Sequence, residues 1–410
     1  MTTEVRAMRA DEWDAWFDTV VRAFGADPAE QEERRAWRGV LEVERALTAV
    51  DGREIVGTAA NYSFRLTVPG GAAVPTAGLS AVSVAPTHRR RGVLTGMMRR
   101  QLDDVRAAGE PLSVLRASEP AIYGRFGYGV ASRCLGATVD TTRVSFAAPP
   151  GTDDVRLRLA DPEKSLPDCE ALYARLVPGR PGMLRRMSAA WERRQVRVRP
   201  GERGDASPLQ CVLAERGGEL VGYARYTFRP RWDDDGPHGS VRLRDLDALD
   251  PAATAALWRY LAGIDLTESI AVHDRPVDDP LQHLVSDPRR CRLRLGDQLH
   301  LRTVEVGAAL AARTYTAPVD VVLDVADAFC PWNAGRWRLS GDGRGAVCER
   351  TDAPAELGLS VRELGAAYLG GVTLAELAEA GLVREERTGA LAAASMAFAG
   401  TRAPWAAYGF

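Results

Sequence analysis

Val-Ser-Val-Ala-Pro-Thr-His-Arg-Arg-Arg-Gly-Val-Leu, residues 82–94, is the stretch that decides the fold of this chain. It continues an alternating apolar strand that starts near Leu79, and it then enters a basic turn that contains Gly92. Apolar residues recur afterwards at the spacing of one helix face, at Leu94, Met97, Met98 and Leu102. This spacing predicts an amphipathic helix. The sequence therefore predicts a strand, a short loop and a helix in direct succession.

The loop of this unit has the composition of an anion-binding site. The first N–H groups of a helix have no partner within the helix, and the helix dipole is positive at that end. Arg89, Arg90 and Arg91 add positive charge, and Gly92 allows the backbone to approach a ligand closely. We therefore expect a pyrophosphate to bind here, as part of a nucleotide-like cofactor. The alternative is a solvated basic turn that binds nothing.

Two other phosphate-binding motifs are absent from the sequence. Lys164 is the only lysine, so no P-loop lysine is available, and no Gly-x-Gly-x-x-Gly follows a strand to open a helix. The Arg-Arg-x-Gly turn instead resembles the acetyl-CoA loop of GNAT-type N-acetyltransferases. In those proteins this turn holds the pyrophosphate of CoA.

The composition is that of a globular protein with two or three domains. The chain has 410 residues, of which 46% are hydrophobic and 26% charged, and it is too long for one ordinary core. Its net charge of −2 gives no electrostatic case for a nucleic-acid partner. Neither a signal peptide nor a membrane-spanning run is present, so we expect a cytoplasmic protein without a membrane partner. The six cysteines and five histidines lack ligand-like spacing, so no metal is expected.

Residues 1–145 are predicted to form the cofactor-binding domain. Helices come first, antiparallel strands follow, and the strand–loop–helix unit completes the order. Helices are predicted at 11–24 and 29–38, and strands at 41–50, 54–66, 74–84, 112–117 and 130–140.

Residues 146–300 repeat this order loosely and are predicted to form a second, degenerate domain of the same kind. Helices are expected at 162–177 and 181–195. The counterpart of the basic loop reads Leu-Asp-Ala-Leu-Asp-Pro-Ala-Ala, residues 246–253, and lacks the Arg-Arg-x-Gly turn. Because an acidic loop would repel a pyrophosphate, we expect no CoA in this copy.

Residues 301–410 differ in kind from the first two segments. Strand-like and helical stretches alternate here, which predicts a five-stranded sheet with helices on one face. The five strand-like stretches are 299–306, 318–324, 335–340, 346–350 and 357–361. The predicted fold class of the whole chain is therefore α+β.

Three local matches together resemble one protein family. They are Pro-Thr-Ala-Gly-Leu-Ser at 75–80 followed by the basic turn, Ala-Ser-Glu-Pro-Ala-Ile-Tyr-Gly-Arg-Phe-Gly-Tyr-Gly at 117–129, and the terminal Phe410. This combination resembles the Eis (enhanced intracellular survival) family of acetyltransferases. The resemblance implies two tandem GNAT-like domains followed by a sterol-carrier-protein-like domain. It also implies acetyl transfer from acetyl-CoA to primary amines of small molecules such as aminoglycosides, hence antibiotic resistance, and assembly as a homohexamer.

The resemblance also implies roles for individual residues. Tyr123 matches the general acid, and the α-carboxylate of Phe410 matches the general base. Ser118 and Glu119 would lie beside the acetyl end of the cofactor, and Asp27 and Trp37 are expected to line the acceptor pocket. The strand and turn that would hold acetyl-CoA comprise Val82, Ser83, Val84, Arg90, Arg91, Gly92, Val93, Leu94 and Thr95.

Two of these roles have support in the residues themselves. A tyrosine hydroxyl, with a pKa of about 10, can protonate a departing thiolate of similar basicity. Most chain ends fray, but the last six residues include Trp405, Tyr408 and Phe410, which favours a docked chain end. The alternatives are that Tyr123 and the tail serve only for packing. In the best-known member of the family an acidic residue precedes the terminal aromatic, and this chain has Gly409 at that position.

Three functions follow as hypotheses. The first is the N-acetyltransferase acting on small amines. The second keeps the GNAT fold but uses lysine side chains or peptide N-termini as acceptors. The third is a lipid- or sterol-binding protein that uses an apolar tunnel in the C-terminal domain, with the chain end away from the acetyl site.

Overall fold

A computed structural model describes residues 3–198 and 204–410 of the chain. Within these residues the chain forms two compact units. The first consists of Met1–Ser132, Arg180–Arg185 and Gln298–Phe410, and the second of Arg133–Gly179 and Arg186–Asp297. Helices and sheets are mixed in both units, which confirms the predicted α+β character.

The N-terminal sheet contains seven strands in the order β1-β2-β3-β4-β5-β16-β6. Strands β1 to β4 pair antiparallel, β4 and β5 pair parallel, and β16 pairs antiparallel with both β5 and β6. The strands are β1 (Glu4–Ala7), β2 (Ala46–Asp51), β3 (Glu54–Thr67), β4 (Ala73–Val84), β5 (Leu112–Leu115), β6 (Gly129–Val130) and β16 (His300–Thr303). The predicted strands at 41–50, 54–66, 74–84 and 112–117 are therefore present in this sheet as β2 to β5, whereas most of the one predicted at 130–140 forms β7 (Arg133–Asp140) of the second sheet.

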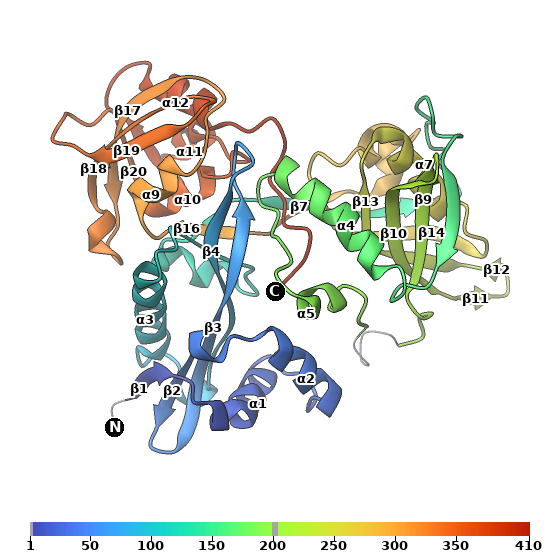
Figure 1. Cartoon of the computed structure of the whole chain (residues 1–410), viewed down its shortest axis with the longest axis horizontal. Coiled ribbons are helices and arrows are strands. Elements are labelled where there is room, and N and C mark those ends of the chain that lie inside the picture. The colour runs from blue at the N-terminus through green and yellow to red at the C-terminus, as the bar shows by residue number, and fades with distance from the viewer. Residues whose placement is uncertain (1–2, 199–203) are drawn as a thin grey trace. The chain divides into compact units, whose positions relative to one another are not determined.

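Helices α1 (Trp13–Ala23) and α3 (Val93–Ala107) pack against this sheet, and α2 (Gln31–Val40) follows α1. Figure 1 shows α3 on one side of β2–β4 and α1 and α2 on the other. Helix α3 is the one predicted from the residues after the basic turn. Its apolar face is buried, as the periodicity predicted, through Met97, Met98 and Leu102.

A second seven-stranded sheet has the order β15-β7-β14-β13-β10-β9-β8. Its strands are β7 (Arg133–Asp140), β8 (Arg156–Ala160), β9 (Gln210–Arg216), β10 (Glu219–Arg229), β13 (Gly239–Ala248), β14 (Thr267–Pro276) and β15 (Arg294–Asp297). A small hairpin of β11 (Trp232–Asp233) and β12 (Gly236–Pro237) accompanies it. Among its described residues, this unit has the helices α4 (Leu166–Leu176), α5 (Ala189–Arg193), α7 (Pro251–Ala262) and α8 (Leu281–Leu284).

The helix predicted at 181–195 forms only in its second half, as α5. Residues 180–185 instead run beside β3, with bonds from Thr67 N–H to the Met183 carbonyl (2.9 Å) and from Gly182 N–H to the Thr67 carbonyl (2.8 Å). These bonds satisfy backbone groups that a helix would have paired internally. The prediction was wrong here because local periodicity cannot show a distant strand edge.

The C-terminal sheet has five strands, as predicted, in the order β19-β18-β17-β20-β21. They are β17 (Val319–Ala326), β18 (Gly335–Gly341), β19 (Ala346–Arg350), β20 (Leu357–Ser360) and β21 (Val383–Glu385). The accompanying helices are α9 (Val306–Ala311), α10 (Val361–Ala367), α11 (Leu374–Glu379) and α12 (Ala390–Phe398). Short 3-10 turns lie at Ala10–Glu12, Val43–Arg45, Pro86–His88, Pro120–Ile122, Gly124–Phe126, Val177–Gly179, Pro288–Cys291 and Pro331–Asn333.

One strand predicted for the C-terminal sheet lies elsewhere. Residues 299–306 were expected in that sheet, but β16 lies in the N-terminal sheet between β5 and β6, and β21 is the fifth strand instead. All four residues of β16 are buried, so the strand needs a partner on each side. The domain limits at residues 145 and 300 stay predictions. The sheets cross them, because β7 pairs in the second sheet and β16 in the first.

Candidate active site

A β-bulge in β4 shapes the strand that precedes the basic turn. Thr58 of β3 pairs with Ser83, and Ala60 pairs with Ser80, so two residues of β4 face one residue of β3. Ala81 has φ +52°, in the left-handed region that only some residues adopt readily. The Thr58 hydroxyl donates to the carbonyl of Ala81 (2.7 Å) and lies 2.7 Å from the Ser83 hydroxyl. The Thr58 side chain thus holds the bulge in place.

Strand β4 continues beyond its parallel neighbour. The ladder between β4 and β5 extends from Thr76 paired with Leu112 to Leu79 paired with Leu115, and β4 runs on to Val84. The two strands therefore diverge at the bulge. Residues 82–84 present a strand edge to which an extended ligand can hydrogen-bond as a further strand would. These are the residues predicted to hold the pantetheine arm.

The basic turn forms the N-terminus of α3. Arg90 has φ +62° and Gly92, the N-cap residue, has φ +84°. Left-handed residues among right-handed ones turn successive N–H groups toward one concave side, which favours an anion. The first intrahelical bond runs from Gly96 N–H to the Gly92 carbonyl (2.9 Å), so the N–H groups of 93–95 precede it. Arg89, Arg90 and Arg91 are exposed around this turn.

His88 anchors the turn to the sheet. Its side chain is buried, its Nε2 lies 3.1 Å from the Asp51 carboxylate, and its Nδ1 lies 2.8 Å from the Thr87 hydroxyl. Asp51 ends β2 at the hairpin turn that leads into β3. The arginines that follow His88 are thereby held next to the end of β4.

Tyr123 lies between two 3-10 turns, Pro120–Ile122 and Gly124–Phe126. Its ring packs edge-on against Tyr128, with ring centroids 6.2 Å apart. Burial, and secondarily the charge of Glu119, raise the pKa of the Tyr123 hydroxyl. The hydroxyl therefore stays protonated to a higher pH than that of a free tyrosine. Ser118 and Glu119, just before this turn, are exposed.

The chain end docks on the N-terminal sheet. The Phe410 ring packs edge-on against Phe64 of β3, with centroids 4.9 Å apart. A methyl group at Gly78 of β4 would lie 2.3 Å from the Phe64 ring and 3.3 Å from the Phe410 ring, so only glycine leaves room for this packing. Gly78 precedes the bulge by three residues. The terminal aromatic ring therefore lies close along the sheet to where β4 and β5 diverge.

Upstream contacts fix the tail. The side-chain amide of Gln298 binds both backbone groups of Ala406. Its Nε2 donates to the Ala406 carbonyl (3.0 Å), and its Oε1 accepts the Ala406 N–H (2.9 Å). Trp405 donates its backbone N–H to the Pro181 carbonyl (2.9 Å). Trp405 and Tyr408 are buried. The docked chain end that the aromatic residues predicted is thus present, and Gln298 is part of it that no sequence pattern indicated.

The two predicted acceptor residues lie on the α1–α2 pair. Asp27 is exposed in the connection between the helices. Trp37 is half-buried, and its ring lies 5.8 Å from that of Phe17 of α1. Neither position by itself defines a pocket, so their role stays a prediction.

The second unit has a similar divergence of strands, but its own side chains occupy it. Strands β13 and β14 pair parallel only as far as Leu243 and Val272, although β13 runs on to Ala248. Beyond that point Arg275, which is buried, donates to the Leu246 carbonyl (2.6 Å) and pairs with Asp279 (2.7 Å). This strand edge is therefore already bonded within the protein.

The N-terminus of α7, the helix that follows β13, is likewise bonded to groups of the protein itself. Asp250 caps α7 by accepting the N–H of Ala253 (2.9 Å), and it also pairs with Arg216. A carboxylate thus lies where the first unit has a basic turn, as the sequence predicted. Both features that would bind CoA in the first unit are engaged by the protein's own groups in the second.

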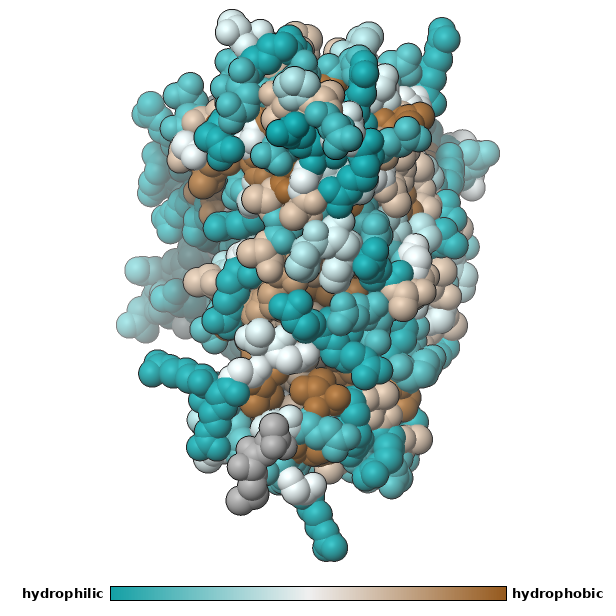
Figure 2. Space-filling view, turned by 90° about the vertical axis from the view of Figure 1, so that its left-hand side faces the viewer, coloured by the Kyte–Doolittle hydropathy of each residue, from teal (hydrophilic) through white to brown (hydrophobic). Residues whose placement is uncertain are grey.

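None of the helices within 3–198 and 204–410 has the length and apolar character needed to cross a membrane. On the face drawn in Figure 2, hydrophilic residues predominate and hydrophobic ones form small separate patches. The same residues contain no group of three or more His, Cys, Asp or Glu side chains that could hold a metal ion.

Comparison with known proteins gives the same three-part layout. Family models described as acetyltransferase (GNAT) domains match residues 4–131 and 182–302, and a sterol carrier protein domain matches residues 306–407. An uncharacterized N-acetyltransferase of Streptomyces avermitilis is 60% identical over the full length of both chains. The N-acetyltransferase Eis of Mycobacterium tuberculosis is 36% identical, over 97% of both chains.

A solved structure agrees with these relatives. The crystal structure of Eis1 from Mycobacterium abscessus matches the whole of both chains with a TM-score of 0.83 and 34% identity. The predicted tandem GNAT domains with a sterol-carrier-protein-like domain are thus confirmed. With its strand edge, basic turn and docked chain end, the chain is an N-acetyltransferase and belongs to the Eis family.

Proposed function

We propose that the protein transfers the acetyl group of acetyl-CoA to a primary amine of a small molecule, within a ternary complex. The observation that carries this proposal is the arrangement around β4. The open edge at 82–84 leads directly into the basic turn, and the terminal Phe410 docks beside Gly78 on the same strand. The proposed cofactor-binding edge and the docked carboxyl terminus thus both lie at strand β4.

Acetyl-CoA supplies the acetyl group as a thioester, and the residues present fit it. The N–H groups of Val93, Leu94 and Thr95, with Arg90 and Arg91, would hold the pyrophosphate. The β4 edge would pair with the amide-containing arm, as a strand does. The N–H of Val84 would donate to the thioester oxygen, where negative charge develops during attack.

Tyr123 is the proposed general acid. The departing thiolate needs a proton, and a tyrosine hydroxyl can supply it if it remains protonated. Because its pKa is raised above the ordinary value of about 10, the hydroxyl keeps its proton throughout the neutral range. Ser118 and Glu119 precede this residue on the exposed side of the turn.

The carboxylate of Phe410 is the proposed general base. A free α-carboxyl group has a pKa of about 3.5, so it is ionised at neutral pH but is a weak base. Its negative charge would hold the substrate ammonium and accept a proton as the amine attacks. Gln298 and the Phe64–Gly78 packing support this role because they fix the end of a chain that would otherwise fray.

The acceptor we propose is a polyamine-like small molecule, of which aminoglycosides are one class. Asp27 and Trp37, on the α1–α2 pair, are the proposed lining residues. Gly409 provides no second carboxylate next to the terminal one, so polycations should be held less tightly than by a chain with an acidic residue there. Assembly as a homohexamer remains part of the proposal, and light scattering in solution tests it.

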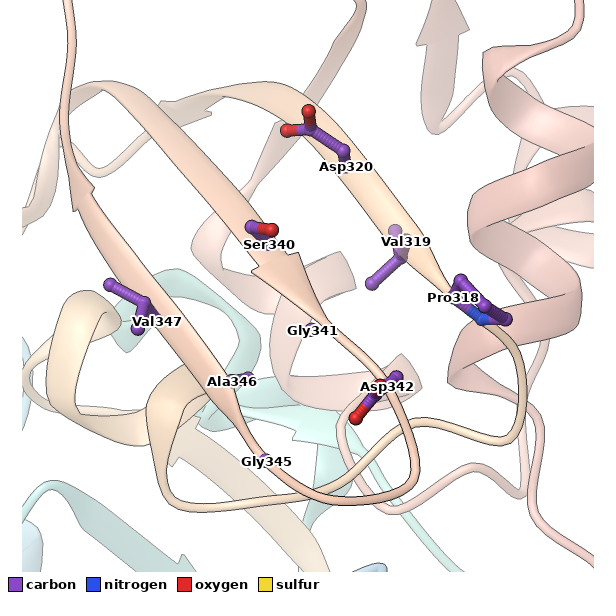
Figure 3. A pocket seen from close by; sticks show the side chains of 9 residues that line it. All are labelled: Pro318, Val319, Asp320, Ser340, Gly341, Asp342, Gly345, Ala346 and Val347. Carbon is purple, nitrogen blue, oxygen red and sulfur yellow. The ribbon is translucent and has the colours of Figure 1, made fainter.

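One pocket of the C-terminal domain bears on the lipid hypothesis. A pocket of about 550 Å³ lies at one end of β17, β18 and β19. Figure 3 shows Asp320, Ser340 and Asp342 among the side chains that line it. Together with Pro318, Val319, Ala346 and Val347 they give a mixed lining, whereas the lipid hypothesis requires an apolar tunnel. The lipid hypothesis also needed the chain end away from the acetyl site, whereas Phe410 docks on β3 and β4.

Thiol release from acetyl-CoA, measured over a panel of amines, tests the proposed function. The panel contains aminoglycosides, linear polyamines, monoamines and a lysine peptide. We expect small primary amines to be acetylated and Tyr123→Phe to lower kcat by about 10²- to 10⁴-fold without weakening CoA binding. With the native protein, the rate should not fall at alkaline pH until above the ordinary tyrosine range, because the pKa of Tyr123 is raised. Preference for the lysine peptide, or native turnover by Tyr123→Phe, would contradict the proposal.

A further inference from the structure

A buried ion pair reaches the turn that holds Tyr123. Arg302 of β16 donates through one guanidinium nitrogen to the carbonyl of Phe126 and through the other to the carboxylate of Asp327. The side chains of Arg302 and Asp327 are 0% and 1% exposed. Phe126 in turn donates its N–H to the Tyr123 carbonyl (3.0 Å). Two hydrogen bonds therefore connect the guanidinium to the backbone of Tyr123.

Asp327 is itself held by several donors. One carboxylate oxygen accepts the N–H groups of Phe329 (3.1 Å) and Cys330 (2.9 Å). The other accepts the side-chain amide of Asn333 (3.1 Å) in addition to Arg302. A carboxylate with this many partners has one orientation, and it fixes the plane of the guanidinium.

The loop 327–333 also contacts the turn and the cofactor helix directly. The Phe329 ring packs edge-on against Phe126, with centroids 5.1 Å apart. Arg99 of α3 lies over the other side of this contact, 4.4 Å from the Phe329 ring, and donates to the Phe329 carbonyl (2.9 Å). Trp332 lies under Arg106 of the same helix, at 4.5 Å. One loop of the C-terminal domain therefore fastens both the Tyr123 turn and α3.

Stability alone does not explain this arrangement. Burying an ion pair costs solvation that the attraction often fails to recover, so such pairs are poor evidence of a gain in stability. Gly127 makes the approach possible, because a methyl group there would lie 1.7 Å from the Arg302 guanidinium. The lack of a side chain at Gly127 thus leaves room for the buried Arg302 guanidinium at the Phe126 carbonyl.

We propose that Arg302 and Asp327 are positioning residues for Tyr123, and that loop 327–333 is, besides the Phe410 tail, a second part of the C-terminal domain on which catalysis depends. This rests on the proposed role of Tyr123 as general acid. The hydroxyl must lie within hydrogen-bonding reach of the leaving sulfur, and a displacement of about 1 Å costs roughly 10²-fold in rate. Loosening the pair should therefore lower turnover without affecting the cofactor turn at 89–95.

A double-mutant cycle tests this inference. We expect Asp327→Asn to lower kcat by about 10- to 100-fold and to leave the KM for acetyl-CoA unchanged. In the Tyr123→Phe background the same substitution should change kcat by less than about twofold, because the group it positions is already gone. An additive loss in the double variant, with the usual loss in Tyr123→Phe, would overturn the positioning role alone. Native turnover by Tyr123→Phe would overturn the proposed role of Tyr123 as general acid, and this inference with it.

A second buried pair provides the matched control. Arg225 and Asp245 lie in the other unit, with side chains 0% and 14% exposed. Asp245→Asn should lower the melting temperature to a similar extent as Asp327→Asn but leave kcat unchanged, and an equal loss of kcat would overturn the inference. If Asp327→Asn does not fold, Phe329→Leu removes the ring contact and keeps the ion pair. It should show a smaller loss of kcat with the same non-additivity, and full activity would overturn the role of the loop.

Discussion

Thr58 shows how one hydroxyl shapes the cofactor edge. A hydroxyl has one hydrogen, and that of Thr58 goes to the carbonyl of Ala81. The Ser83 hydroxyl must therefore be the donor in its 2.7 Å contact with Thr58. Both bonds bridge β3 to the bulged part of β4. Left-handed backbone costs a non-glycine residue about 1–2 kcal/mol, so Ala81 needs this support.

We expect Thr58→Val to raise the KM for acetyl-CoA by roughly 5- to 10-fold, since the carbonyl of Ala81 loses its buried partner. Valine keeps the shape of threonine, so the packing of β3 should survive. Unfolding in denaturant should show a loss of about 1–3 kcal/mol. An unchanged KM would mean that the bulge does not depend on this hydroxyl.

The neighbouring strand offers the control. Thr48 of β2 pairs with Thr58 across the ladder, and its hydroxyl is buried with no hydrogen-bond partner among the described residues. Thr48→Val should leave the KM unchanged and should be neutral or stabilising, because it removes an unpaired polar group from the core.

At this scale the sequence shows some site residues and hides others. Tyr123 and the arginines of the turn lie in local motifs, so a single stretch of sequence indicates them. Thr58 lies inside an apolar strand, and Gln298 lies more than a hundred residues before the Ala406 that it binds. Their roles depend on pairing between distant segments, which no local pattern records.

Among the elements, α3 and its preceding turn are the proposed site of the cofactor contacts. Gly92 has φ +84° with open space around it, so the strain of a side chain there would be purely conformational. We expect Gly92→Ala to weaken CoA binding by roughly tenfold. The free turn can relax out of the left-handed conformation, which alanine disfavours by about 1–2 kcal/mol, and it must regain that conformation to bind CoA. Titration calorimetry measures the change.

The other end of the same helix supplies the matching control. Gly109 follows α3 with φ +72°, and it too has nothing within 4 Å of an added methyl group. Gly109→Ala should cost similar stability and leave CoA binding intact. The native protein should bind about one CoA per chain in this experiment, since Arg275 and Asp250 occupy the corresponding features of the second unit. Two sites per chain would contradict that account.

The predictions of helices and strands are most accurate where the apolar periodicity and the turn-forming residues agree. The strand, turn and helix from Leu79 to Leu102 are present as predicted, and so is the five-stranded sheet of the C-terminal domain. The sequence did not reveal that β16 belongs to the N-terminal sheet and not to the C-terminal one. It also did not reveal that residues 180–185 run beside β3. In both cases the partner strand, rather than the segment's own pattern, decides the outcome.

The first unit draws its proposed active site from three distant parts of the chain. The N-terminal sheet supplies the strand edge and Tyr123, residues 180–185 support the tail, and the C-terminal domain supplies the tail itself. Burial of Trp405 and Tyr408 ties the end of the chain to this unit. The carboxyl terminus is therefore a proposed functional group of the N-terminal domain.

Replacing the α-carboxylate of Phe410 by a carboxamide, through ligation of a synthetic C-terminal peptide, tests this claim most directly. The change keeps the phenyl ring and removes only the charge and basicity of the chain end. A ligated protein with the native carboxylate serves as the reference. The account predicts a loss of acetylation of about 10²-fold or more with unaltered acetyl-CoA binding by calorimetry. Equal acetylation rates for the carboxamide and the carboxylate would contradict it.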